Sequence, residues 1–178
     1  MLLRNDGRDA TGTIRFSDVA MATGADDIKD GRGMATADFD NDGDLDIVIN
    51  NSSGDSGRPE MARASLLRNN VGQRHHWLAV ELKGTESNRD AVGALVTIET
   101  GTEKQVRLLS AGSGFASQHS ARLYFGLGDR TKVDAISVKW PTGKVERFER
   151  IGDKSIDAGQ LLRITEGKSI EGGSLPPK

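Results

Sequence analysis

The sequence predicts an all-β protein: a repeat unit of four short strands, followed by an antiparallel β-sandwich or barrel-like domain. Three observations favour this fold class. The 178 residues include 22 glycines, which indicate many tight turns, and hydrophobic residues make up only 35% of the chain. Segments in which apolar and polar residues alternate also recur between glycines, as is typical of half-buried strands.

The first part of the chain is expected to form one repeat domain, residues 1–70. Short strands are predicted at 13–19, 34–39, 45–50 and 65–68, separated by turns rich in glycine and aspartate. The stretch LLRND at 2–6 recurs as LLRNN at 66–70, identical at four of five positions. This spacing is typical of one repeat, or blade, of a β-propeller with a long loop.

A second domain is expected over residues 71–167. Its predicted strands lie in the alternating segments 77–84, 94–100, 104–110, 121–128, 135–143, 145–151 and 160–166. This density of strands is typical of a sandwich or a barrel. Residues 168–178 contain GGS and PP and are expected to form a flexible tail.

Composition excludes several classes of function. The formal net charge is −2, yet five of the 26 acidic residues lie in the nine residues from Asp38 to Asp46. Basic residues are scattered singly, so no nucleic-acid partner is expected. The chain has no cysteine and therefore no disulfide or thiolate metal site. No apolar stretch approaches the roughly 20 residues of a membrane span, and the first residues do not resemble a signal peptide.

The segment DFDNDGDLD, residues 38–46, predicts a calcium-binding loop held between two strands. Counting from Asp38 as position 1, carboxylates fall at positions 1, 3, 5 and 9, with Gly43 at position 6 and Asp44 at position 7. Carboxylates at alternate positions converge when the backbone curls around an ion, and the glycine permits the sharp turn. The residue at position 7 normally contributes its backbone carbonyl.

The loop is not an EF-hand, because position 12 is Ile49 rather than glutamate and the flanking residues are β-branched and alternating. The alternative is a solvated turn rich in aspartate and asparagine. Four uncompensated carboxylates would repel one another, which favours a bound cation. Calcium is preferred to magnesium because a flexible cage of protein oxygens suits the larger ion.

These residues resemble two known families. The loop DFDNDGDLDIVI, preceded by GRGMATA and followed by SLLRNN, is similar to the FG-GAP/VCBS repeat of integrin-like β-propellers. The segments AVGALVTI (91–98), SAGSGFASQ (110–118), LYFGLG (123–128) and VDAISVKWPTG (133–143) together resemble the ASPIC/UnbV domain of cartilage acidic protein-like proteins. The resemblance implies that Asp38, Asp40, Asp42 and Asp46 bind calcium, with Asp44 acting through its carbonyl.

The resemblance also implies a function. We expect a non-catalytic calcium-dependent binding or adhesion module, the C-terminal fragment of a longer secreted propeller protein, located extracellularly, in the periplasm or at the cell surface. Its expected partners are a carbohydrate or an extracellular protein, and further propeller blades against which it packs. Two alternatives stay open: an accessory domain of a secreted enzyme that acts on polysaccharide, and a purely structural propeller cap.

The second domain contains further candidate site residues. Phe115 and Gln118, in a glycine-rich loop, could present a ring and an amide to a ligand, although a buried ring is the favoured alternative. His119 lies near several serines, but no nucleophile-elbow motif is present and catalysis is not expected. Tyr124 departs from the family pattern, which argues against a ligand role there. Trp140 is expected in the core.

Overall fold

The computed structural model describes residues 1–53 and 58–176, and these form two compact units. The first comprises Met1–Met34 and Val48–Leu67, and the second comprises Ala35–Ile47 and the chain from Arg68 onward. The limits expected from the sequence, 1–70 and 71–167, differ from this division. The aspartate-rich loop belongs to the second unit and not to the strands that precede it in the chain.

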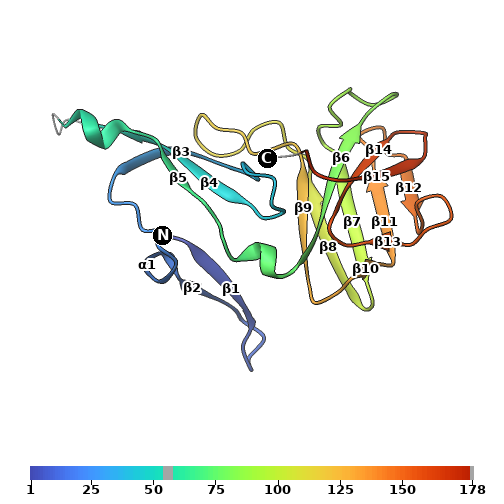
Figure 1. Ribbon diagram of the computed structural model, residues 1–178, viewed down its shortest axis with the longest axis horizontal. Helices are drawn as coiled ribbons and strands as arrows, with labels where there is room; N and C mark the ends of the chain where they lie inside the picture. Colours follow the sequence, from blue (N-terminus) through green and yellow to red (C-terminus); the bar gives the residue numbers. More distant parts are fainter. Residues whose placement is uncertain (54–57, 177–178) are drawn as a thin grey trace. The chain divides into compact units, whose positions relative to one another are not determined.

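The all-β prediction is confirmed (Figure 1). In the described part of the chain, the one α-helix is α1 (Ala20–Thr23), and two short 3₁₀ helices span Pro59–Ala62 and Gly72–Arg74. The strands form separate sheets, and no sheet of the described residues closes into a barrel.

The four strands predicted in the first part of the chain exist, but they do not form one sheet. β1 (Leu3–Arg8) pairs with β2 (Ile14–Asp18), while β3 (Asp30–Ala37), β4 (Asp46–Ser52) and β5 (Ser65–Leu67) form a second sheet in that order. The turn between β1 and β2 explains the difference. The Asp9 carboxylate accepts the N–H groups of Thr11 and Thr13 at 2.9 and 3.1 Å, which closes a local hairpin and gives β2 the partner that precedes it.

The second unit contains a β-sandwich. One sheet has the order β12-β11-β7-β8 and the other the order β15-β14-β6-β9, and two short strands pair beside them. Every strand predicted after residue 76 is present. The bounds are β6 (His76–Lys83), β7 (Leu95–Thr100), β8 (Glu103–Leu108), β9 (Leu123–Gly128), β10 (Lys132–Val133), β11 (Ala135–Lys139), β12 (Val145–Phe148), β13 (Ile156–Asp157), β14 (Gln160–Thr165) and β15 (Ile170–Gly173).

The main core lies between these two sheets. Alternate residues of β7 and β11, such as Val96, Ile98 and Ile136, are at most 1% exposed and meet Leu78 and Phe125 of the opposite sheet. Burial of alternate positions is the consequence of a period of two along each strand. Trp140 is 1% exposed in the same core, as expected, and its indole N–H donates to Glu146 at 2.8 Å.

Two features of the sandwich differ from expectation. β6 pairs with β14 in parallel, within a unit expected to be antiparallel throughout. The expected flexible tail 168–178 was wrong for residues 170–173, because these form β15, which pairs antiparallel with β14 and buries Ile170 in the core. Gly167, with φ +73°, gives the chain the turn that returns it to the sheet.

Candidate metal centre

The aspartate-rich loop connects β3 to β4 and curls tightly around the side chain of Asp38. The Asp38 carboxylate accepts the backbone N–H groups of Asp42 and Gly43 at 3.1 and 3.0 Å. Asn41 and Gly43 adopt φ values of +54° and +98°, in the left-handed region that lets the chain reverse within a few residues. The local sequence therefore folds as predicted, with glycine at the turn.

Three of the five predicted ligands lie together. Carboxylate oxygens of Asp38, Asp40 and Asp42 are all within 4.8 Å of one another. Oxygen atoms at this separation can contact one cation, and an oxygen-only donor set fits a hard ion such as calcium. The chemistry and spacing of the side chains therefore fit the ion that the loop sequence implies.

Asp46 and Asp44 lie outside that group of three carboxylates. Asp46 is 1% exposed, and its two oxygens accept the N–H groups of Phe39 and Asn69 at 2.9 and 2.8 Å. The buried Asp44 donates its N–H to Asp42 at 3.2 Å. Asp46 thus ties both ends of the loop to the following chain, while its role as a ligand, and that of Asp44, remain predictions.

Tyr124 of β9 also contacts the loop, which the sequence did not indicate. Its hydroxyl donates to the Asp38 carboxylate at 2.9 Å and accepts from Arg122 at 3.0 Å. Burial is the main cause that raises the pKa of Tyr124 to about 12; the Arg122 guanidinium opposes this shift, and the Asp38 carboxylate adds to it. The hydroxyl therefore keeps its proton and orients Asp38.

Positive charge lies beside the acidic loop. Arg68 approaches Asp40 at 3.4 Å, and Arg122 reaches the Asn41 side chain at 3.5 Å. Arg122 is also paired with Glu81 at 2.9 Å, so its charge is shared between the loop and the sheet. These arginines offset part of the repulsion among the aspartates.

The loop packs against the outer face of the sheet that contains β6 and β9. On that face Ala79, Tyr124 and Leu161 are buried, and Trp77 packs beside them. The Trp77 indole lies so close to Gly43 that an added methyl group there would sit 2.0 Å from the ring nitrogen. The turn of the loop therefore depends on a residue more than thirty positions further along the chain.

The other predicted contacts occupy the connection between β8 and β9. Phe115 is 72% exposed, so the favoured expectation of a buried ring was wrong, and Gln118 is also exposed. Gly114 and Ala116, with φ values of +72° and +46°, form the tight turn that presents Phe115. His119 accepts the N–H of Thr36 on Nδ1 at 3.1 Å, so this nitrogen faces the backbone of β3 rather than a serine.

Comparisons with known proteins identify both parts of the chain. Residues 31–60 match the FG-GAP repeat, and residues 84–171 match the family described as ASPIC and UnbV. The chain carries an FG-GAP repeat followed by an ASPIC/UnbV domain. The FG-GAP match contains the whole aspartate-rich loop, and the ASPIC/UnbV match contains the strands from β7 to β14.

Curated relatives carry the same name in three vertebrates. Cartilage acidic protein 1 is 35% identical over 117 residues in Mus musculus, covering 65% of this chain and 17% of the relative. The Homo sapiens protein is 33% identical over 138 residues, covering 76% and 19%, and that of Xenopus tropicalis is 34% identical over 120 residues, covering 65% and 17%. The region of similarity thus covers less than a fifth of the length of each of these relatives. Within its described residues, no helix has the length and apolar character needed to cross a bilayer.

Proposed function

We propose that this chain is an extracellular, non-catalytic binding or adhesion module whose FG-GAP loop holds one calcium ion. The observation that carries the proposal is the convergence of Asp38, Asp40 and Asp42 on a β3–β4 loop that lies within the FG-GAP match. The carbonyl of Asp44 and the carboxylate of Asp46 would add oxygens toward the six to eight that calcium takes. An affinity in the range of about 10⁻⁴–10⁻³ M, as in other extracellular modules, is expected.

The ion would act mainly on structure. The loop contacts the outer face of the sandwich through Trp77 and Tyr124, so an ion that fixes the loop would also stabilise its packing on this face within the second unit. This arrangement also favours the second candidate function, a structural cap against which further propeller blades pack. For the binding role, the ligand would be a carbohydrate or an extracellular protein, and the exposed Phe115 and Gln118 are proposed contacts for it.

Calcium is expected to stabilise the protein. Saturating calcium should raise the melting temperature by about 5 °C relative to chelator, because a ligand that binds only the folded state adds to its stability. Isothermal titration calorimetry should give one ion per chain. Asp42→Asn should weaken binding at least about tenfold, since it removes one charged ligand. Asp153→Asn, an exposed aspartate outside the loop, is the matched control. A melting temperature that is the same in calcium and in chelator would refute the proposal.

Tyr124 is expected to tune the affinity through Asp38. Tyr124→Phe keeps the ring in its buried position but removes the hydroxyl that orients the carboxylate. The dissociation constant for calcium should rise about tenfold, the usual cost of losing a partner that orients a ligand. Titration calorimetry measures the affinity, and the melting temperature in chelator shows whether the fold is intact. If the folded variant bound calcium with unchanged affinity, Tyr124 would have no role in the calcium site.

A further inference from the structure

A cavity of about 160 Å³ lies in the second unit beside the β8–β9 connection. β8 and β9 are edge strands of the two different sheets, and they lie side by side in Figure 1. The side chain of Gln105 joins them by donating to the carbonyl of Gly126 at 2.7 Å. The connection from 109 to 122 therefore crosses one edge of the sandwich, and the cavity lies beneath it.

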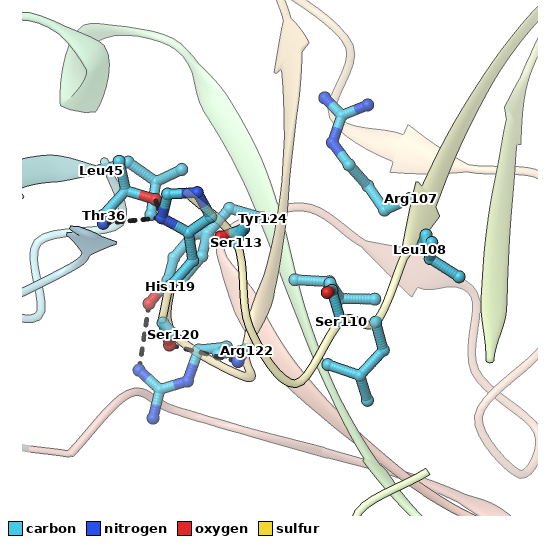
Figure 2. Close-up of a pocket in the computed structure, with 12 residues that line it drawn as sticks. Thr36, Leu45, Arg107, Leu108, Ser110, Ser113, His119, Ser120, Arg122 and Tyr124 are labelled. Carbon is cyan, nitrogen blue, oxygen red and sulfur yellow. Dashed lines mark hydrogen bonds between the residues drawn. The ribbon is translucent and has the colours of Figure 1, made fainter. Parts of the chain in front are cut away.

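The wall opposite this connection comes from Thr36, which precedes the aspartate-rich loop, and from Leu45 near the end of the loop. Two hydrogen bonds hold the walls together. His119 accepts the Thr36 N–H at 3.1 Å, and the Ser120 N–H donates to the Thr36 carbonyl at 2.8 Å. Figure 2 shows Thr36, His119, Ser113 and Tyr124 close together, with Arg107, Leu108 and Ser110 grouped apart from them.

The lining is cationic and rich in hydroxyl groups. It contains two arginines, a histidine, four leucines, four hydroxyl residues of the serine and threonine type, and Tyr124, but no carboxylate. Arg122 is already paired with Glu81. Arg107 forms no ion pair with any of residues 1–53 or 58–176, and its guanidinium lies 5.4 Å from the centre of the Phe125 ring. One cation at the cavity therefore lacks a carboxylate partner.

Two further polar groups are available in the lining. The Ser113 Oγ atom is buried and has no hydrogen-bond partner among the described residues. A buried hydroxyl without a partner is costly, and it indicates that a ligand or water completes the site. His119 uses Nδ1 as an acceptor, which leaves Nε2–H as a donor in the neutral ring.

We propose that this cavity binds a hexuronate, a sugar ring that carries a carboxylate. The Arg107 guanidinium would bind the carboxylate through bidentate, charge-assisted hydrogen bonds. Ser113 and His119 would form hydrogen bonds with sugar hydroxyls. The leucines offer an apolar wall to the C–H face of the ring. The volume is below the range of about 300–1,000 Å³ for drug-sized ligands, so only one ring or one side chain fits. This inference rests on the proposed binding role and names its ligand class.

A hexuronate fits better than an acidic side chain of a protein partner. An aspartate or glutamate side chain would satisfy Arg107 but leave the Ser113 hydroxyl and the His119 Nε2–H group without a ligand contact. A neutral sugar would satisfy the hydroxyl groups but leave the guanidinium without an anion. The combination of one uncompensated cation and several hydroxyl partners requires both functions on one small ligand.

The test is to titrate the calcium-saturated chain separately with D-glucuronate, D-glucose and N-acetyl-L-glutamate. Binding is measured by calorimetry or by NMR chemical-shift changes. Glucuronate should bind at least about tenfold more tightly than either comparison ligand. Arg107→Gln should weaken glucuronate binding about tenfold or more, and Ser113→Ala about threefold. Arg89→Gln removes an exposed cation that does not line the cavity and should leave binding unchanged.

The calcium affinity of every variant is measured separately, so failure of this inference is distinguished from failure of the calcium site. Melting curves confirm that each variant is folded. Absence of glucuronate binding would overturn the inference, as would equal binding of glucose or an unchanged affinity in Arg107→Gln. Equal or tighter binding of N-acetylglutamate would also overturn it and assign the cavity to an acidic protein side chain.

Discussion

Replacing Gly43 with alanine is expected to abolish calcium binding and to destabilise the second unit severely. The added Cβ would lie 2.0 and 2.1 Å from the Nε1 and Cε2 atoms of Trp77, in the body of a rigid indole ring. The backbone also has φ +98°, which costs a residue with a side chain about 1–2 kcal/mol. Together with overpacking, the loss of stability should reach about 3 kcal/mol. Thermal or urea unfolding measures it, and calorimetry measures calcium binding.

Gly143→Ala is the matched control. Gly143 has a similar φ of +91°, but an added Cβ there would meet no atom within 4 Å. The control should therefore show the backbone cost alone, with calcium binding intact. If the two variants were equally stable, the contact with Trp77 would contribute nothing, and the turn geometry alone would explain the requirement for glycine.

The sequence could predict the loop because its chemistry is local. The spacing of Asp38, Asp40 and Asp42 and the glycine at position 6 are contained in a few consecutive residues, and the structure brings these carboxylates together. Trp77 and Tyr124 could not be predicted as neighbours of the loop, since they come from strands 34 and more residues further along the chain and carry no motif. The sequence even argued against a ligand role for Tyr124, because this residue departs from the family pattern.

The same contrast applies to the strands. Alternation located seven strands of the second unit, because a period of two is a property of each segment alone; these are β6, β7, β8, β9, β11, β12 and β14. It missed β10 and β13, whose two residues each are too few to show a period. It says nothing about direction, so the parallel pairing of β6 with β14 was not predicted. The cavity beside Arg107 was also not predicted, because two segments about seventy residues apart build its walls.

The parallel pairing of β6 with β14 has a further consequence at Glu166. Parallel strands end at the same edge of a sheet, and Lys83 at the end of β6 lies opposite Thr165 at the end of β14. Glu166, 1% exposed, thus meets the turn after β6. One of its oxygens accepts the N–H groups of Thr85, Glu86 and Ser87 at 2.9, 2.9 and 2.7 Å, and the other accepts the Ser87 hydroxyl at 2.8 Å.

Glu166→Gln is expected to lower the melting temperature at neutral pH by at least about 5 °C, because charge-assisted hydrogen bonds to a buried carboxylate are among the stronger ones. Thermal unfolding followed by circular dichroism measures the change. Glu86→Gln is the control, since it removes an exposed charge from the same turn but leaves the Glu166 carboxylate in place. Its melting temperature should stay close to that of the unaltered chain.

The effect of Glu166→Gln should also depend on pH. Burial alone would raise the pKa of Glu166, but the N–H groups of Ser87, Thr85 and Glu86 and the Ser87 hydroxyl outweigh it and hold the pKa at about 2, below the ordinary value of 4.5. A carboxyl group with a depressed pKa in the folded state stabilises the fold fully above pH 4.5 and loses this contribution as the pH falls through about 2. The gap in melting temperature between Glu166→Gln and the unaltered chain should therefore be constant from pH 7 to about 5 and narrow steadily toward pH 2. If the difference in melting temperature stayed constant over that whole range, the charge of Glu166 would contribute nothing to stability. The packing of the side chain alone would then support the turn after β6.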